Sequence, residues 1–196
     1  GLNDIMDVTT KPLIFDADNG GRIEHISYLV KTLERIGVSA MVIEDKIGEK
    51  KNSLFENQQK TKQDTIKNFC KKLKVAKNSK ISDDFFIIAR VESFILGKSL
   101  NDALNRATNY VKAGADAILI HSKEKTPKQI FEFAKRLKKT KYYCPLVAVP
   151  STYSKVTEKE LIKKGFKIVI YANQMLRAAY PSMLNIGKEI LKYGRS

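Results

Sequence analysis

Six short apolar runs of the sequence each end in polar side chains that could take part in catalysis. In chain order, these residues are Asp16 and Asp18; Glu44, Asp45 and Lys46; Arg90 and Glu92; His121; Ser151 and Thr152; and Asn173. If the runs are parallel neighbours in one sheet, their polar ends meet, because the carboxyl ends of parallel strands lie on the same side. The pattern therefore predicts one functional site built from several strands.

Three of these residues are candidate metal ligands. Asp16, Asp18 and Glu44 would place hard oxygen donors on neighbouring strands, and Mg²⁺ binds through a few carboxylates while it keeps several waters. Arg90 and His121 would lie across the same edge, where they could hold a carboxylate or a phosphoryl group. A metal ion combined with fixed cations suits a multiply charged anion whose charge moves during a reaction.

Each residue also has a purely structural interpretation. Asp16 and Asp18 could cap the helix that follows them. Arg90 could form an ion pair with Glu92, and His121 could be a core histidine whose hydrogen bonds are satisfied. A functional site is favoured because six strand ends agree, and no single residue decides it.

The apolar runs have the composition of strands that are buried on both faces. They occupy residues 12–18, 37–45, 84–92, 114–122, 144–151 and 165–173. Gly37, Gly114 and Gly165 begin three of them, as expected where a preceding helix ends. Helical periodicity fills the gaps, at residues 21–36, 99–113, 127–139, 156–164 and 174–192.

This alternation predicts an α/β fold with a mostly parallel sheet and right-handed crossovers. Residues 18–21 do not form the Gly-rich turn of an open, doubly wound nucleotide fold. Functional residues at every strand end favour a TIM-type (β/α)8 barrel, here one domain over residues 1–196. A complete barrel has eight strands and about 250 residues. We therefore expect a fragment of about six βα units, roughly two fewer than a complete barrel.

The charge balance favours a solvated surface over nucleic-acid binding. The net charge is +15, but Arg supplies only 7 of the 36 basic side chains. Nucleic-acid readers favour the bidentate guanidinium of Arg. No apolar run approaches the roughly 18 residues of a membrane span, so we expect neither a nucleic acid nor a membrane as partner.

Only two cysteines are present, Cys70 and Cys144, too few for a disulfide framework or a four-thiolate metal site. We interpret both as structural. Residues 1–7 also lack the basic and apolar segments of a signal peptide. A reducing, cytoplasmic location is the simplest expectation.

Residues 44–60 form a long, charged stretch that leaves a strand end with candidate metal ligands. A long loop at the catalytic face is a candidate lid, and an exposed lysine-rich loop is the alternative. The stretch resembles the gating loop of the phosphoenolpyruvate mutase branch of the isocitrate lyase superfamily. That loop reads Glu-Asp-Lys, three residues, Lys, any residue, Asn-Ser, and this chain has Glu44-Asp45-Lys46, then Lys50 and Asn52-Ser53.

The resemblance extends over essentially the whole chain, and it implies that the two missing strands are the first two of the family's barrel. Further segments that match the family are residues 16–20, 89–94, 113–123, 171–173 and 176–178. The resemblance implies that Asp16 ligates Mg²⁺ directly or nearly so, with Asp18 and Glu44 holding its waters. It also implies that Arg90 and His121 act in catalysis and bind the charged groups of the substrate.

The loop residues separate the activities known in the superfamily. Lys50 and Asn52 would be catalytic and Ser53 would bind substrate, in a loop that closes over it. Related lyases carry a catalytic Cys within Lys-Lys-Cys-Gly-His here, and this loop has none, which argues against a carbon–carbon lyase. The sister phosphonopyruvate hydrolases tend to have Thr in place of Asn52, so Asn52 favours the mutase. The family's Phe-Pro before the loop Lys is Gly48-Glu49 here.

The implied reaction is Mg²⁺-dependent interconversion of phosphoenolpyruvate and phosphonopyruvate, with these small molecules as partners. The alternatives are a phosphonopyruvate hydrolase, and a catalytically inactive fragment or binding protein. Family members form homo-oligomers that exchange their last helix. Residues 174–192 are apolar enough for such a contact, although core packing within one chain explains them equally well.

Overall fold

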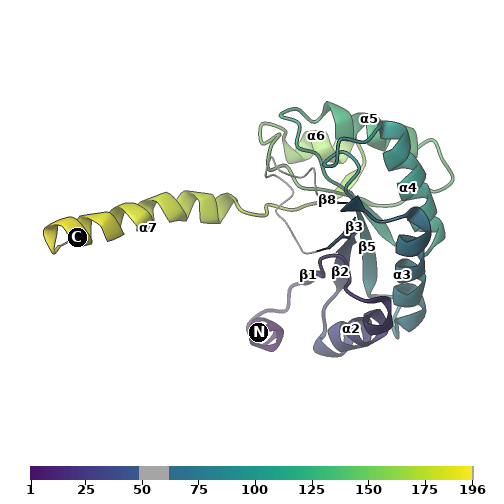
Figure 1. Cartoon of the computed structure of the whole chain (residues 1–196), viewed down its shortest axis with the longest axis horizontal. Coiled ribbons are helices and arrows are strands. Elements are labelled where there is room, and N and C mark those ends of the chain that lie inside the picture. The colour runs from purple at the N-terminus through teal and green to yellow at the C-terminus, as the bar shows by residue number, and fades with distance from the viewer. Residues whose placement is uncertain (49–61, 196) are drawn as a thin grey trace.

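The computed structural model describes residues 1–48 and 62–195, and its centre is one parallel sheet (Figure 1). In spatial order, which is also chain order, the strands are β1 (Ile14–Asp16), β2 (Ala40–Glu44), β5 (Phe86–Val91), β6 (Ala117–Ile120), β7 (Leu146–Ala148) and β8 (Phe166–Val169). Every neighbouring pair is parallel. Sequential parallel strands joined by helices are the topology of a (β/α) barrel, so the prediction of an incomplete TIM-type barrel is confirmed.

Helices cover the outer face of this sheet, and Figure 1 shows most of them as an arc along one side. They are α2 (Ile23–Ile36), α3 (Ile66–Ser79), α4 (Leu100–Lys112), α5 (Lys128–Leu137) and α6 (Glu158–Lys163). Local sequence fixes their ends. Gly37 ends α2 with φ at 94°, a left-handed conformation that glycine adopts without a steric penalty. Ser99 caps α4 by accepting a hydrogen bond from the Asp102 N–H at 3.2 Å.

Successive residues of a strand point to opposite faces of the sheet, so each strand serves two cores. Met41 and Ile43 of β2 pack outward into the main core beneath the helices. Val42 faces inward, in a smaller apolar cluster with Ile88 and Leu119 of the next two strands. The inward positions are therefore the even-numbered residues of β2 and β5 and the odd-numbered residues of β6.

Two short strands form a separate antiparallel pair, β3 (Lys46–Ile47) with β4 (Lys62–Gln63). The pair brings residues 47 and 62 together close to the carboxyl end of β2. The predicted gating loop, residues 44–60, begins at this point, and its residues 49–60 lie outside the described residues.

Two helices remain: α1 (Leu2–Met6), which packs against α2, and α7 (Gln174–Tyr193). Figure 1 shows α7 extending away from the body. None of its side chains is buried against the described part of the chain. Packing within one chain, one of our two interpretations of residues 174–192, is therefore wrong for the described structure. No helix in the described ranges is long and apolar enough to cross a membrane.

Candidate active site

The inward positions bring the predicted site residues of four neighbouring strands to one place. Glu44 follows Val42 by two residues, Arg90 follows Ile88, and His121 follows Leu119, so all three side chains share the inner face. Glu44 and Arg90 are also direct partners in the parallel register. A cavity of about 400 Å³ opens beside Arg90, lined by Asp16, Arg90 and apolar side chains of the inner face.

Arg90 is the centre of this arrangement. Its Nε donates a hydrogen bond to Glu92 Oε1 and lies 3.6 Å from Glu44 Oε2, and its Nη2 is 3.0 Å from His121 Nδ1. Burial alone would lower the pKa of Arg90, but the Glu92 and Glu44 carboxylates raise it, so the guanidinium stays charged. The ion pair with Glu92 that sequence suggested is present, and it fixes a permanent cation at the cavity.

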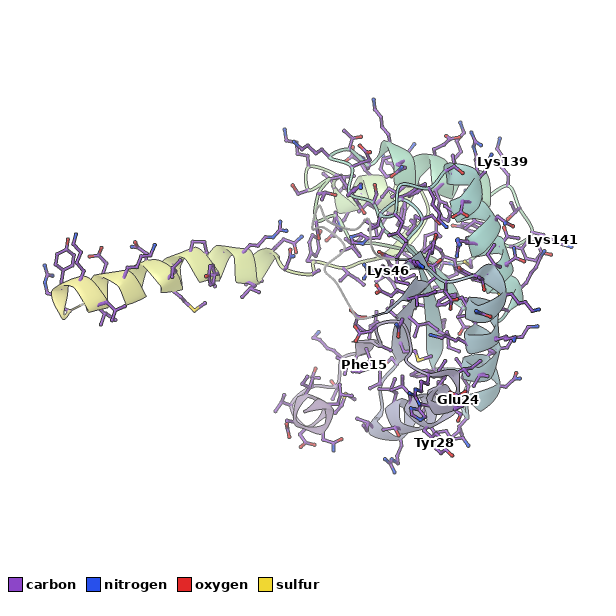
Figure 2. All side chains as sticks on the ribbon, in the orientation of Figure 1. Phe15, Glu24, Tyr28, Lys46, Lys139 and Lys141 are labelled. Atoms are coloured by element: carbon purple, nitrogen blue, oxygen red, sulfur yellow. The ribbon has the colours of Figure 1, made fainter. Side chains whose placement is uncertain are left out.

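Lys46 completes the charge balance beneath the site. Its Nζ lies 3.4 Å from Glu44 Oε1 and 3.4 Å from Glu92 Oε2, and all three side chains are buried. Figure 2 shows Lys46 inside the body, whereas Lys139 and Lys141 lie at its periphery. We call Glu44, Lys46, Arg90, Glu92 and His121 the inner cluster.

The two carboxylates of the inner cluster respond differently to burial. Burial would raise the pKa of Glu92, but the charges of Arg90 and Lys46 bring it well below its usual range. For Glu44, burial is the largest influence and raises the pKa, although Arg90 opposes it. Glu92 is therefore a fixed anion, and Glu44 is the carboxylate that would gain more from an added cation.

His121 is buried, and its two ring nitrogens have different surroundings. Burial lowers its pKa, so the ring is neutral near pH 7, although Glu92 favours the charged form. Arg90 Nη2 is nearer to Nδ1 than Glu92 Oε1 is, at 3.0 Å against 3.5 Å. Because a guanidinium only donates, Nδ1 accepts and the proton lies on Nε2. Within the described residues, Nε2 has no hydrogen-bond partner.

Asp16 and Asp18 occupy the turn that follows β1. The Asp18 N–H donates to Asp16 Oδ1 at 3.1 Å, and the Asp18 carbonyl accepts from the Glu44 N–H at 2.7 Å. Both aspartates are exposed. The helix-cap interpretation is wrong, because α2 begins after Arg22 and has no side-chain cap.

The donor set at this turn fits Mg²⁺. In residues 1–48 and 62–195, no three His, Cys, Asp or Glu side chains are gathered closely enough to enclose a metal ion. Mg²⁺ does not require such a cage, because it keeps several waters and takes one or two protein carboxylates. The exposed oxygens of Asp16 and Asp18, joined to Glu44 through the backbone, offer that chemistry.

Of the remaining candidate residues, some lie in the described part of the chain and others do not. Thr152 donates to the Ser122 carbonyl at 3.1 Å, and Asn173 Oδ1 is buried without a partner in the described part of the chain. The predicted loop residues, Lys50, Asn52 and Ser53, lie outside the described residues.

Sequence reasoning gave no specific role to Lys46, and it gave Glu92 only a structural one, as the ion-pair partner of Arg90. The alternation of side chains could have placed both on the inner face, because Lys46 lies two residues after Glu44 and Glu92 lies two residues after Arg90.

Comparison with known proteins finds a matching family model and similar sequences. A family model described as phosphoenolpyruvate phosphomutase matches residues 1–191. Phosphoenolpyruvate phosphomutase of Tetrahymena pyriformis is 38% identical over 190 residues, which are 96% of this chain and 62% of that protein. Phosphonopyruvate hydrolase of Variovorax sp. (strain Pal2) is 39% identical over 188 residues, 93% of this chain and 62% of that protein.

Solved structures give the same result. A phosphoenolpyruvate phosphomutase from Streptomyces platensis subsp. rosaceus superposes with a TM-score of 0.90 at 34% identity, covering 99% of this chain and 66% of that one. A phosphonopyruvate hydrolase in complex with oxalate and Mg²⁺ gives 0.85 at 36% identity, covering 99% and 65%. The chain thus spans less than two thirds of the length of these relatives. On the family match and these identities, it belongs to the phosphoenolpyruvate phosphomutase family.

Proposed function

We propose that this chain carries the active site of a Mg²⁺-dependent phosphoenolpyruvate mutase, an isomerase that interconverts phosphoenolpyruvate and phosphonopyruvate. The inner cluster carries the proposal, because it fixes the Arg90 guanidinium at the wall of one cavity and holds His121 against that guanidinium. Both substrates are small, multiply charged anions, which a buried guanidinium is suited to bind. The similarity to phosphoenolpyruvate phosphomutases supports the assignment.

Arg90 and His121 act on the organic half of the substrate. The phosphoryl group leaves the enol oxygen and returns to carbon 3, so negative charge develops on that oxygen. Arg90 stabilises this charge, and its own position is fixed by Glu92 and Glu44. His121 donates a further hydrogen bond from Nε2 and does not need to change its protonation state.

The metal site is assigned to Asp16, with Asp18 and Glu44 holding metal-bound waters. Asp16 lines the same cavity as Arg90, which brings the aspartate and the guanidinium to one substrate. When bound, Mg²⁺ supplies positive charge that a developing enolate requires. The solved relative with oxalate and Mg²⁺ supports this assignment.

The segment 44–60 is proposed to be the gating loop, with roles that rest on its sequence. Lys50 and Ser53 contact the substrate, and Asn52 holds the phosphoryl group in orientation. Phosphoryl transfer has a loose transition state, so positioning and charge decide the rate. Exclusion of water then decides whether the phosphoryl group returns to carbon or is hydrolysed.

The second candidate is a phosphonopyruvate hydrolase. It is favoured by one observation: the relative with that name is as similar to this chain as the mutase is, at 39% against 38% identity. Asn52 is the residue that favours the mutase, and Asn52→Thr is the substitution that should move the chain toward hydrolysis.

The test is phosphorus-31 NMR of the full chain with phosphonopyruvate and Mg²⁺. A phosphoenolpyruvate signal is the expected result. Phosphate above the enzyme-free control would identify the hydrolase instead. Removal of Mg²⁺ with a chelator should stop turnover, and Asp16→Ala should have little turnover at a Mg²⁺ concentration that saturates the wild type.

A matched pair of histidines provides the control for this experiment. His121→Gln should lower the rate, because it replaces the imidazole ring that lies 3.0 Å from Arg90 Nη2. His25→Gln should leave the rate unchanged, since His25 is exposed on α2. Equal effects in the two variants would contradict the assignment of the inner cluster.

We also propose that a second copy of the chain covers α7. Leu176, Met183 and Ile190 are spaced seven residues apart along the helix and are 63%, 59% and 47% exposed, the spacing of a helical contact stripe. Light scattering should report an oligomer for the wild type and a monomer for the Leu176→Lys/Ile190→Lys variant. A monomeric wild type would exclude the contact.

A further inference from the structure

Asp45 follows Glu44 in sequence but points to the outer face of the sheet. Its side chain is fully buried and accepts four hydrogen bonds. The donors are Tyr110 Oη at 2.6 Å, Gln63 Nε2 at 2.9 Å, the Glu92 N–H at 3.0 Å and Arg106 Nη1 at 3.3 Å. A buried carboxylate is stable only when it is paired and hydrogen-bonded, and here both of its oxygens are satisfied.

The donors to Asp45 come from three separate elements: α4, β4 and the end of β5. Arg106 Nη1 also donates to Tyr110 Oη, in the same helix, at 2.9 Å and to the Asp64 carbonyl, which follows β4, at 2.8 Å. Tyr110 gives its single hydrogen to Asp45 and accepts from Arg106, so its hydroxyl is fully used. Tyr110 and Arg106 thus form one connected unit with Asp45.

This unit is joined directly to the backbone of the candidate active site. The paired register of β2 and β5 ends at Glu44 opposite Arg90. Two further bonds continue it: the Asp45 N–H donates to the Arg90 carbonyl at 3.2 Å, and the Glu92 N–H donates to Asp45 Oδ1. The side chain of Asp45 therefore takes the place of a ladder partner for Glu92.

We propose that Asp45, Arg106 and Tyr110 are positioning residues, which fix from the outer face of the sheet the backbone that projects Arg90 and Glu92 into the active site. None of the three lines the inner cavity. Their effect on the reaction is transmitted through the Glu92 N–H and the Arg90 carbonyl. The kinetic part of this inference rests on the proposed function, and the structural part does not.

The discriminating variant is Tyr110→Phe, which removes one hydroxyl and keeps the ring. Phe69→Leu is its matched control, because Phe69 is equally buried and its ring centroid lies 4.6 Å from that of Tyr110. For Tyr110→Phe we expect kcat to fall about tenfold or more, with KM changed less than about threefold. Phe69→Leu should lower stability and leave kcat unchanged.

A second readout on the same variants does not depend on turnover. In Tyr110→Phe, amide hydrogen exchange at Glu92 should accelerate, while exchange at Ile88, in the middle of β5, should not. Phe69→Leu should not single out Glu92 in this way. Arg106→Lys, which keeps the charge, should retain more of kcat than Arg106→Met.

The outcomes separate the two proposals. Absence of turnover in the wild type would remove the proposed function, and accelerated exchange at Glu92 would still establish the structural unit. Wild-type exchange at Glu92 in Tyr110→Phe would overturn the inference. So would a kcat that falls equally in Tyr110→Phe and Phe69→Leu, because both variants would then act only through the core.

Discussion

Glu44 and Asp45 are consecutive buried acids at the end of β2, yet they lie in two different regions. Glu44 faces the inner cluster, where its nearest cations are Lys46 at 3.4 Å and Arg90 at 3.6 Å. Asp45 faces the outer core, where its hydrogen bonds are 2.6 to 3.3 Å long. Charge-assisted hydrogen bonds are usually shorter than about 3 Å, so the outer carboxylate is the more fully satisfied of the two.

The two arginines show the same contrast. Arg90 lines a cavity of about 400 Å³, whereas Arg106 is enclosed by Asp45, Asp102 and Tyr110. An inner group can therefore change partners when a ligand enters, and an outer group cannot. Substitutions on the inner face should act first on the reaction, and those on the outer face first on stability.

The largest expected effect is on the reaction, in Arg90→Met. This change removes the cation shared by Glu44, Glu92 and His121. Each hydrogen bond to a charged group contributes about 1.5–3 kcal/mol, so two lost contacts to substrate predict a fall in kcat/KM of roughly 10²- to 10⁴-fold. Steady-state kinetics on folded protein measures it.

Arg136→Met is the control for Arg90→Met, because Arg136 is exposed and pairs with Glu132 on the surface of α5. Its kcat/KM should equal that of the wild type. If Arg90→Met retained more than about a tenth of the wild-type value, the inner face would not be the reacting face.

The next largest effect is on stability, in Asp45→Ala. Removal of one partner of a buried ion pair leaves the other uncompensated, at about 3–5 kcal/mol of unfolding free energy. Glu44→Ala should cost less, because water in the cavity can solvate Arg90. Urea unfolding of the two variants compares them directly, and equal losses would remove the distinction between the faces.

Alternation along the strands made much of this site predictable. The polar residues that follow Val42, Ile88 and Leu119 at two-residue spacing are those that meet on the inner face. We call Asp45, Arg106 and Tyr110 the outer unit. Its formation was not predictable from the sequence, because Asp45 and Tyr110 are 65 residues apart and only the packing of α4 on the sheet joins them. The apolar pattern of α7 likewise shows a contact face without showing what covers it.

Glu92 and Asp45 should affect the pH dependence of stability in opposite directions. Arg90 and Lys46 together hold the pKa of Glu92 below its usual value despite burial. The stability that Glu92 contributes is therefore complete above its unfolded pKa of about 4.3, and is lost as the pH falls toward the folded value. Burial instead raises the pKa of Asp45, which contributes with the opposite sign.

Urea unfolding between about pH 6 and pH 3 tests the prediction for Glu92. The wild type should lose stability as the pH falls, and Glu92→Gln should lose less over the same range because that carboxylate no longer titrates. An identical slope in the two proteins would show that Glu92 is not the acid-sensitive carboxylate of the inner cluster.

The smallest effect tests how far the outer unit extends along α4. Ser99→Ala removes the cap of that helix, and Thr157→Ala removes the corresponding cap of α6. Each should cost about 1 kcal/mol of unfolding free energy and leave kcat unchanged. Ser99 is joined to the unit through Asp102, which accepts from both Ser93 Oγ and Arg106 Nε.

Double variants with Tyr110→Phe measure that connection. Distant sites add within about 0.5 kcal/mol, whereas sites in one network do not. Thr157→Ala should therefore be additive with Tyr110→Phe, and Ser99→Ala should depart from additivity. If both pairs were additive, the outer unit would end at Arg106. The start of α4 would then support the helix without helping to place Glu92.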